Sequence, residues 1–258
     1  MKDLTIIVPV HEYNETIEAL LIKAIKSVSL QEKIIENPEV MVVYKSGLNI
    51  NENLVKSEYN NLTFLENKGK TDFSSQINLG VENISTSYFS ILEFDDEFSV
   101  YFLKNVKIYL ESYPKTDVLL PLVVEVDKNN RFNGFNNEIS WSKSIMENWE
   151  LGLLRNDVLQ NISRFLISGG VFKKESFTEI GKLKTKFKFN VGYEFLLRAT
   201  HNDLVVRVMP KIGYMHVLDR EGAYLISLAN SITQEEVKKW HNIAKKEYVF
   251  NEDRDFIL

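Results

Sequence analysis

The sequence contains no cysteine, which excludes disulfides, thiolate metal sites and a cysteine nucleophile. It also has no excess of positive charge, because 31 Lys and Arg face 36 Asp and Glu and give a net charge of −5. A surface built throughout to hold DNA or RNA is therefore excluded, although a local basic patch is not. Long hydrophobic runs are absent as well. The longest strongly apolar run covers residues 118–124 and contains Pro121, whereas a membrane-crossing helix needs about 20 apolar residues.

The remaining composition is that of a folded protein. With 258 residues, one large domain or one domain with a small appendage is expected. A hydrophobic content of 44 % and an aromatic content of 12 % supply enough apolar area for one thick core, which excludes general disorder. The N-terminal apolar stretch stops at Pro9 and is too short and wrongly flanked for a signal peptide. We therefore expect a soluble cytoplasmic protein without a membrane span.

Strand and helix signals alternate through the first half of the sequence. Residues 4–10 form a β-branched apolar run, which is typical of a strand buried on both faces. Asn14 is expected to cap a helix whose apolar residues recur at three- and four-residue spacing as far as Val28. Asp72 is expected to cap a second helix. Further strands are predicted at residues 40–44, 62–65 and 88–94.

The second half continues this alternation. Helices are predicted at residues 100–111 and 192–200, strands at 117–126 and 204–209, and a short strand after Ser168-Gly169-Gly170. The polar, Asn-rich stretch 127–140 is expected to be a loop, and Pro210 is expected to end the last strand. Thr233 and Glu236 have the spacing of a capping box, which predicts a C-terminal helix.

This order of elements predicts an α/β, Rossmann-like layered domain with a central, mostly parallel sheet and C-terminal helices. In such folds the ligand crevice lies at the carboxyl ends of the strands. We expect the domain to cover residues 1–220, divided into halves at about residue 110, with a helical extension over residues 221–258.

Four carboxylates stand within five residues at the end of the apolar strand predicted at 88–94: Glu93, Asp95, Asp96 and Glu97. Like charges at this spacing repel and raise each other's pKa, and a divalent cation with oxygen ligands relieves both penalties. At the carboxyl end of a strand, such acids are well placed to hold a nucleotide diphosphate through Mg²⁺ or Mn²⁺. A solvated acidic turn is the alternative interpretation of the acids alone.

Five segments, in order, resemble the family 2 glycosyltransferases of GT-A fold over roughly residues 4 to 220. They are Thr5-Ile6-Ile7-Val8-Pro9-Val10-His11-Glu12, Ser75-Gln76-Ile77-Asn78-Leu79-Gly80, Leu92-Glu93-Phe94-Asp95-Asp96, Gly169-Gly170-Val171-Phe172-Lys173-Lys174-Glu175 with Glu179-Ile180-Gly181, and Tyr193-Glu194-Phe195-Leu196-Leu197-Arg198. The third looks like the family's Leu-Asp-x-Asp-Asp metal motif. The resemblance implies a GT-A fold and a hexosyl- or pentosyltransferase that moves a sugar from a nucleoside-diphosphate sugar to a hydroxyl acceptor, with inversion at the anomeric carbon.

The resemblance also implies roles for individual residues. Residues 1–110 would be the half that binds the nucleotide sugar and 111–220 the acceptor half. Asp95 matches the metal-binding acid. Glu93 stands in the place of the first Asp, and its longer side chain leaves direct ligation and a water-mediated or ribose contact both open. Asp96 matches the third acid, which we count with the catalytic residues. The metal would be Mn²⁺ or Mg²⁺, acting as a Lewis acid on the departing diphosphate. The first strand and its loop would lie beside the base and ribose through Pro9, Val10 and Glu12.

Three departures from the family pattern leave roles open. The second strand usually ends in an Asp that reads the nucleobase, but here Tyr44 follows, either to stack on the base or as a strand aromatic. The usual Arg before the helix Asn is Ile77, so Lys70 or Asp72 could contact the donor, with a plain helix cap as the alternative for Asp72. The usual general-base Asp is absent at Gly192. Glu194 is the nearest carboxylate and our candidate base, unless it only complements the helix dipole.

Two further features concern the diphosphate and the acceptor. His216 could complete the metal shell and Arg220 could clamp the diphosphate, as in some GT-A enzymes; a structural histidine is the alternative. Lysines recur from Lys173 to Lys188, either as a solvated face or as a surface for an anionic acceptor, and nucleic acid is conceivable only as such an acceptor. The rival functions are a GT-A-like binding protein without turnover and a nucleotidyltransferase that makes sugar nucleotides.

Overall fold

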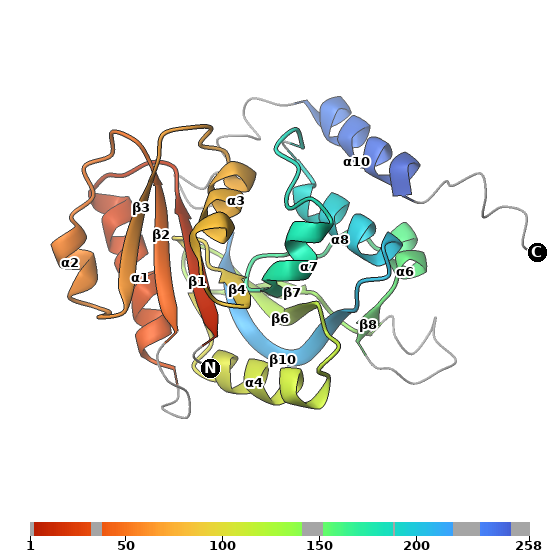
Figure 1. The fold of residues 1–258 in the computed structure, drawn as a ribbon, viewed down its shortest axis with the longest axis horizontal. Helices are drawn as coiled ribbons and strands as arrows, with labels where there is room; N and C mark the ends of the chain where they lie inside the picture. The colour runs from red at the N-terminus through yellow and green to blue at the C-terminus, as the bar shows by residue number, and fades with distance from the viewer. Residues whose placement is uncertain (1–2, 32–37, 141–151, 188, 219–232, 249–258) are drawn as a thin grey trace, which may run out of the picture.

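The computed structural model describes residues 3–31, 38–140, 152–187, 189–218 and 233–248, whose strands form one mixed sheet (Figure 1). The strands lie in the order β3-β2-β1-β4-β9-β6-β10-β5, with β7 beside β6 and β8 beside β10. β3, β2, β1, β4, β6 and β10 run in one direction. The bounds are β1 (Leu4–Val10), β2 (Glu39–Lys45), β3 (Leu62–Asn67), β4 (Tyr88–Ile91), β5 (Glu97–Phe98), β6 (Val118–Val126), β7 (Phe132–Asn136), β8 (Leu153–Leu154), β9 (Val171–Lys173) and β10 (Val206–Val217).

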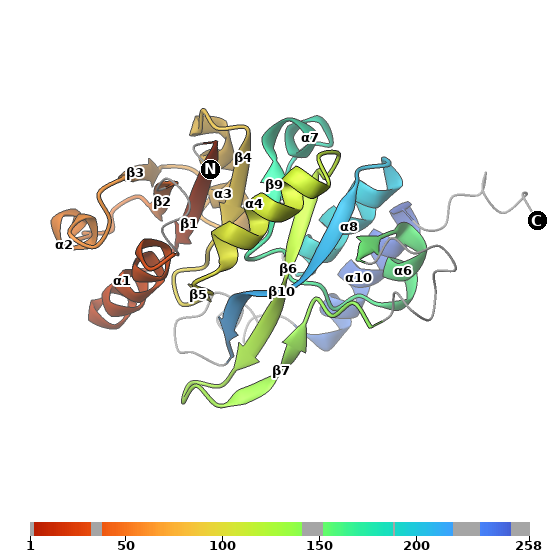
Figure 2. The same ribbon diagram turned by 90° about the horizontal axis from the view of Figure 1, so that it is seen from below.

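Helices cover both faces of this sheet, which gives a three-layered domain as predicted (Figures 1 and 2). Alternate residues of β1 explain the layers, because Leu4, Ile6 and Val8 pack in one apolar cluster with α1 and α4, and Ile7 packs in the other with α3, α7 and α8. The helix bounds are α1 (Glu15–Ser29), α2 (Glu52–Lys56), α3 (Phe73–Asn83), α4 (Phe102–Ser112), α6 (Asn156–Asn161), α7 (Lys174–Glu179), α8 (Val191–His201) and α10 (Gln234–Tyr248).

The predicted caps are confirmed. The Asn14 side chain accepts a hydrogen bond from the backbone N–H of Ile17 at 3.0 Å, and the Asp72 side chain accepts one from Ser75 N–H at 3.0 Å. At the start of α10, Thr233 Oγ1 accepts from Glu236 N–H at 3.2 Å while a Glu236 carboxylate oxygen accepts from Thr233 N–H at 3.1 Å. Each cap satisfies backbone donors that the first helical turn leaves unpaired.

The stretch expected to be a loop, residues 127–140, contains strand β7. Asp127 turns the chain sharply, because its carboxylate accepts hydrogen bonds from the backbone of Asn129 and Arg131, both at 2.8 Å. The returning chain then pairs with β6 in antiparallel register. Because most of this strand's side chains lie on the surface, its sequence has no apolar run that indicates a strand.

Strand β10 does not end at Pro210, as predicted, but continues to Val217. The register with β6 shifts between Met209 and Ile212 and again between Ile212 and Tyr214. A proline is tolerated at such an irregularity because no ladder hydrogen bond needs its missing N–H. The extension carries His216 to the carboxyl edge of the sheet.

Helix α10 packs on α8, on the side away from α1 and α4 (Figure 1). Ala244 and Tyr248 are buried there, and Trp240 packs against the same apolar cluster. The predicted boundary at residue 220 falls outside the described residues and stays a prediction. Within the described part of the chain, no helix combines the length and the apolar character that crossing a membrane requires.

Candidate active site

Three titratable side chains meet where β4 and β10 end. Glu93 and Asp96 follow β4, whose line is continued by a hydrogen bond from Leu92 N–H to the carbonyl of Ile7 at 3.0 Å. His216 lies near the end of β10, which runs in the same direction. One ligand atom from each of Glu93, Asp96 and His216 lies within 4.8 Å of the others. The carboxyl ends of the strands thus gather these residues, as the fold predicts.

Asp96 is the most buried member of this triad. It is 1 % exposed, and each of its oxygens has a partner on β10. Oδ2 lies 2.9 Å from His216 Nδ1, and Oδ1 accepts a hydrogen bond from the backbone N–H of Val217 at 2.9 Å. These contacts fix the carboxylate and imidazole with respect to each other and to the sheet.

Glu93 is held by Ser168 and Tyr214, for which the sequence predicted no role in the site. Ser168 Oγ donates a hydrogen bond to Glu93 Oε1 at 2.6 Å, and the Glu93 backbone N–H donates to the Tyr214 hydroxyl oxygen at 3.1 Å. Tyr214 is fully buried against Gly169, where a Cβ would lie only 2.6 Å from its ring. The pair Ser168-Gly169 was the available signal, since the close approach of the ring requires glycine.

The negative charge at this edge is only partly neutralised. Burial and then the charges of Asp96 and Glu93 raise the pKa of Asp95 to about 7. Burial and Asp96 likewise raise the pKa of Glu93. Burial opposes protonation of His216, but the hydrogen bond to Asp96 and the three neighbouring carboxylates raise its pKa to about 9. The edge therefore stabilises positive charge strongly.

This donor set fits a divalent cation. Two carboxylates and one imidazole offer the oxygen and nitrogen ligands that suit Mn²⁺, and carboxylates alone suit Mg²⁺. A cation would also relieve the repulsion that raises the pKa values of Glu93 and Asp95. Of the two residues predicted as ligands, His216 belongs to the triad and Asp95, although buried in the same run, does not.

A pocket opens beside the triad and shares Glu93 with it. Its walls come from the end of β1, the approach to α3 and the acidic run; they are formed by Pro9, His11, Thr71, Phe73, Gln76, Glu93 and Phe94. Four of these residues have ring side chains, and the ring centroids of His11 and Phe94 lie 5.5 Å apart. The space between these walls is about 10 Å³, which is room for one water in this conformation. A larger ligand would enter only after the walls move apart.

The other residues predicted to contact the donor lie around this pocket or away from it. The carbonyl of Val10 accepts a hydrogen bond from the Gln76 side chain. Glu12 does not line the pocket; its carboxylate is 3.9 Å from His11 Nε2. Tyr44 packs edge-on against Phe64 at the end of β2, as the alternative of a strand aromatic predicts. Asp72 caps α3, as the alternative of a helix cap predicts. Arg220 lies outside the described residues.

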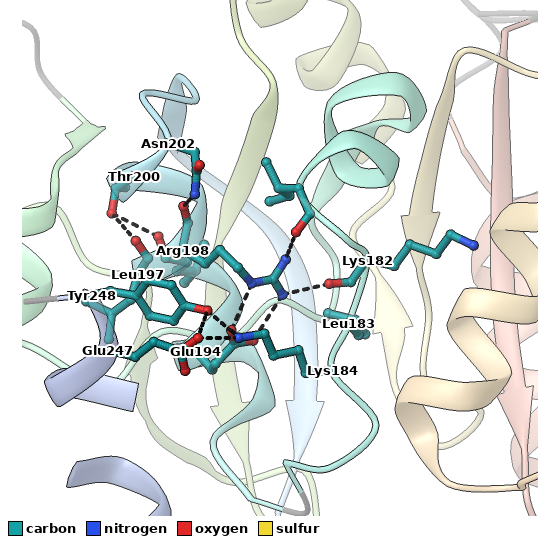
Figure 3. A network of polar contacts seen from close by, with 12 residues as sticks. Lys182, Leu183, Lys184, Glu194, Leu197, Arg198, Thr200, Asn202, Glu247 and Tyr248 are labelled. Carbon is teal, nitrogen blue, oxygen red and sulfur yellow. Dashed lines mark hydrogen bonds and ion pairs between the residues drawn. The ribbon is translucent and has the colours of Figure 1, made fainter. Parts of the chain in front are cut away.

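Glu194 is placed in a different environment from the one that a general base needs. It is 0 % exposed, and its two oxygens accept hydrogen bonds from Arg198 Nε at 2.8 Å and Nη2 at 3.0 Å (Figure 3). Lys184 lies 3.3 Å from the same carboxylate. A carboxylate enclosed by two cations cannot reach an acceptor hydroxyl in this conformation. The geometry favours a structural role of Glu194, and its role as general base stays a prediction.

Comparison with known proteins fits this geometry. The model of the family "Glycosyl transferase family 2" matches residues 5–197, whereas no curated protein sequence matches the chain. Similar solved structures include S. aureus TarS 1–349 in complex with UDP-GlcNAc, with a TM-score of 0.68 and 14 % identity over 98 % of this chain and 69 % of that one. A longer S. aureus TarS structure gives 0.65 and 15 % over 99 % of this chain and 45 % of that one. At such identities the likeness shows the shared GT-A fold alone. The family match covers most of the chain, so the chain belongs to glycosyl transferase family 2 and is a glycosyltransferase.

Proposed function

We propose that this enzyme transfers a sugar from a UDP-sugar to a hydroxyl acceptor with the help of a divalent cation. The observation that carries the proposal is that Glu93 belongs both to the triad and to the ring-walled pocket. A nucleotide whose base enters the pocket would pass its ribose along Glu93 and present its diphosphate to Asp96 and His216. The ligands of the S. aureus TarS structures, UDP-GlcNAc and UDP, support a uridine donor.

Glu93, Asp96 and His216 are the residues that would hold the cation, and Asp95 stays a predicted ligand. When bound there, Mn²⁺ or Mg²⁺ supplies Lewis-acid stabilisation of the negative charge that develops on the departing diphosphate. Asp96 keeps the imidazole oriented through the 2.9 Å contact with Nδ1. Ser168 holds the Glu93 carboxylate in the direction of the triad.

The resemblance to the family supports transfer with inversion. The surroundings of Glu194 do not support this residue as the general base that inversion needs.

The contacts of the lysines that follow Lys173 bear on the charge of the acceptor. Lys173 pairs with Glu175, Lys174 donates to the carbonyl of Ile84, and Lys182 and Lys184 pair with carboxylates of this chain. Because these lysines serve the protein itself, we propose a hydroxyl acceptor without a required negative charge.

Release of UDP from a UDP-sugar in the presence of Mn²⁺ tests the proposal. We expect slow hydrolysis without acceptor, and at least about 100-fold less with Asp96→Asn, since charge stabilisation of a leaving group has that size. Glu97→Gln is the matched control. Glu97 stands in the same acidic run but pairs with Lys23 at 2.5 Å, so its loss should leave hydrolysis unchanged.

Two outcomes would contradict the proposal. If no UDP-, GDP-, CMP- or TDP-sugar is hydrolysed or raises the melting temperature, the proposed donor is wrong. If Asp96→Asn hydrolyses UDP-sugars as fast as the wild type, the triad is not the centre of the reaction.

A further inference from the structure

Gln76 is a fully buried polar residue in the wall of the ring-walled pocket, and half of its amide has no partner. It lies in the first half of α3 and is 0 % exposed. Its Nε2 donates to the carbonyl of Val10 at 3.2 Å and to the carbonyl of Thr71 at 3.1 Å. No donor among the described residues reaches its Oε1.

The orientation of this amide is fixed by its neighbours. Both contacts of Nε2 are carbonyl oxygens, which accept hydrogen bonds and cannot donate them. Flipping the amide would set the side-chain oxygen against two acceptors, so the oxygen must be the atom without a partner. A buried acceptor without a donor is costly, and native proteins rarely keep one without a ligand or water to satisfy it.

The walls around this oxygen offer stacking surfaces for a flat ring, which would enter once the walls move apart, because the space between them now holds about one water. Pro9, His11, Phe73 and Phe94 contribute rings to these walls, and ring faces stack well on planar heterocycles. The oxygen of Gln76 therefore requires a hydrogen-bond donor on a planar group. Tyr44 and Lys45, at the end of β2, offer no carboxylate that could accept such a donor instead.

We propose that Gln76 Oε1 accepts the imide N–H of a uracil base and so makes this enzyme select uridine donors over cytidine donors. This inference rests on the proposed function, because it assumes that the nucleotide base enters the ring-walled pocket. Uracil carries a hydrogen at N3, whereas cytosine has a lone pair there and would face the oxygen of Gln76 with a second acceptor. The residue thus selects by leaving a buried polar atom unpaired for the wrong base.

Calorimetric titration of UDP, N3-methyl-UDP, CDP and 2′-deoxy-UDP with Mn²⁺ present tests the proposal on the unaltered protein. We expect N3-methyl-UDP and CDP to bind about 10- to 100-fold more weakly than UDP, the range for one buried hydrogen bond that cannot form. A Gln76→Met variant should lose UDP affinity and bring the ratio of UDP to N3-methyl-UDP affinity close to one. Gln160→Met, on the exposed side of α6, is the control for the same change and should keep the wild-type ratio.

Each other outcome overturns a defined part of the account. If N3-methyl-UDP binds the wild type as tightly as UDP, a fixed water or nothing satisfies Gln76 and the inference is wrong. If instead only 2′-deoxy-UDP loses affinity and Gln76→Met removes that loss, the oxygen binds a ribose hydroxyl. If UDP does not bind the wild type with Mn²⁺, the proposed function itself fails and the inference with it.

Discussion

The acidic edge around Glu93 and the buried network around Glu194 both hold carboxylates away from water, but they balance charge differently. At the edge, Glu93, Asp95 and Asp96 share one imidazole, that of His216. In the network, Glu194 has Arg198 and Lys184 within 3.3 Å. A sequence shows acids in both places. Only the surroundings tell which acids are left with unmatched charge for a ligand.

In the network around Glu194, the charged side chains have hydrogen-bond or ion-pair partners within the protein (Figure 3). Besides Glu194, the Arg198 guanidinium donates to the backbone carbonyls of Ile180 and Lys182. Lys184 also contacts Glu247 and Tyr248 of α10. The network therefore joins three parts of the molecule: helix α8, the segment after α7, and helix α10. We propose that it stabilises the fold and takes no part in the reaction.

The largest effect is expected from removing one side of the buried pair. Arg198→Met should lower the free energy of unfolding by about 3–5 kcal/mol, because it leaves the Glu194 carboxylate buried without its main partner. Urea unfolding followed by circular dichroism measures this. Lys186→Met removes an exposed cation from the same stretch and should change stability by less than about 0.5 kcal/mol. Equal effects of the two variants would show that the pair is not structural.

Replacing an acid of the edge and an acid of the network by its amide should have different effects, on activity in the first case and on stability in the second. Asp96→Asn should reduce UDP-sugar hydrolysis about 100-fold or more while the protein stays folded. Glu194→Gln should keep hydrolysis within about threefold while losing about 1–3 kcal/mol of stability, since a charge-assisted hydrogen bond is weakened. Hydrolysis rates and urea midpoints of both variants check this. The comparison breaks if folded Glu194→Gln is inactive, because Glu194 would then act in the reaction.

Much of the fold could be predicted from the sequence because its signals are local. The apolar run of β1, the Asn14 and Asp72 caps and the capping box at Thr233 all depend on residues close in the chain. The path of β10 beyond Pro210 could not be predicted, because partner strand β6 and two register shifts sustain it. Strand β7 was missed for a similar reason, since a surface strand has no apolar run.

For the candidate site, the sequence motifs predicted which residues take part but not which of them lie in contact. Asp96 and His216 were both singled out, yet their contact spans the sheet and is visible only in the structure. Gln76 lies in one of the segments that resemble the family, but the sequence predicted no role for it. Its side-chain oxygen is left unpaired only because the carbonyls of Val10 and Thr71 fix the amide, which the structure alone shows. The surroundings of Glu194 could not be predicted either, because the sequence does not show that Arg198, one turn later, donates hydrogen bonds to its carboxylate.

A smaller effect is expected from the support of Glu93. Ser168→Ala removes the hydroxyl that donates to Glu93 Oε1 at 2.6 Å. We expect UDP to bind about 3- to 10-fold more weakly in the presence of Mn²⁺, the value of one hydrogen bond to a charged group that partly reorganises. Calorimetry measures it, with Ser29→Ala at the exposed end of α1 as control. Unchanged affinity would mean that Glu93 is oriented without Ser168.

The smallest effect concerns pH and the attachment of α10. Burial opposes ionisation of Glu247, but hydrogen bonds from Lys184 and Tyr248 outweigh it and lower the pKa of Glu247 from 4.5. Its contribution to stability is therefore complete above pH 4.5 and is lost as the pH falls through the lower value of the folded state. Because the side chain is 47 % exposed, we expect less than about 0.5 kcal/mol.

Urea unfolding of the wild type and Glu247→Gln at several pH values checks this. The wild type should be slightly more stable at pH 7, and the difference should vanish near pH 3. A difference that persists unchanged at low pH would show that the ionised form of Glu247 contributes nothing to the attachment.

The most direct measurement is the anomalous scattering of manganese in a crystal grown with Mn²⁺ and UDP. The account predicts one anomalous peak between Glu93, Asp96 and His216, at about 2.0–2.3 Å from their ligand atoms, with the diphosphate beside it and uracil in the ring-walled pocket. No anomalous peak should lie beside Glu194. Bound UDP with no manganese at the triad, or manganese held elsewhere, would contradict the central claim that unmatched charge at this edge binds the donor through a cation.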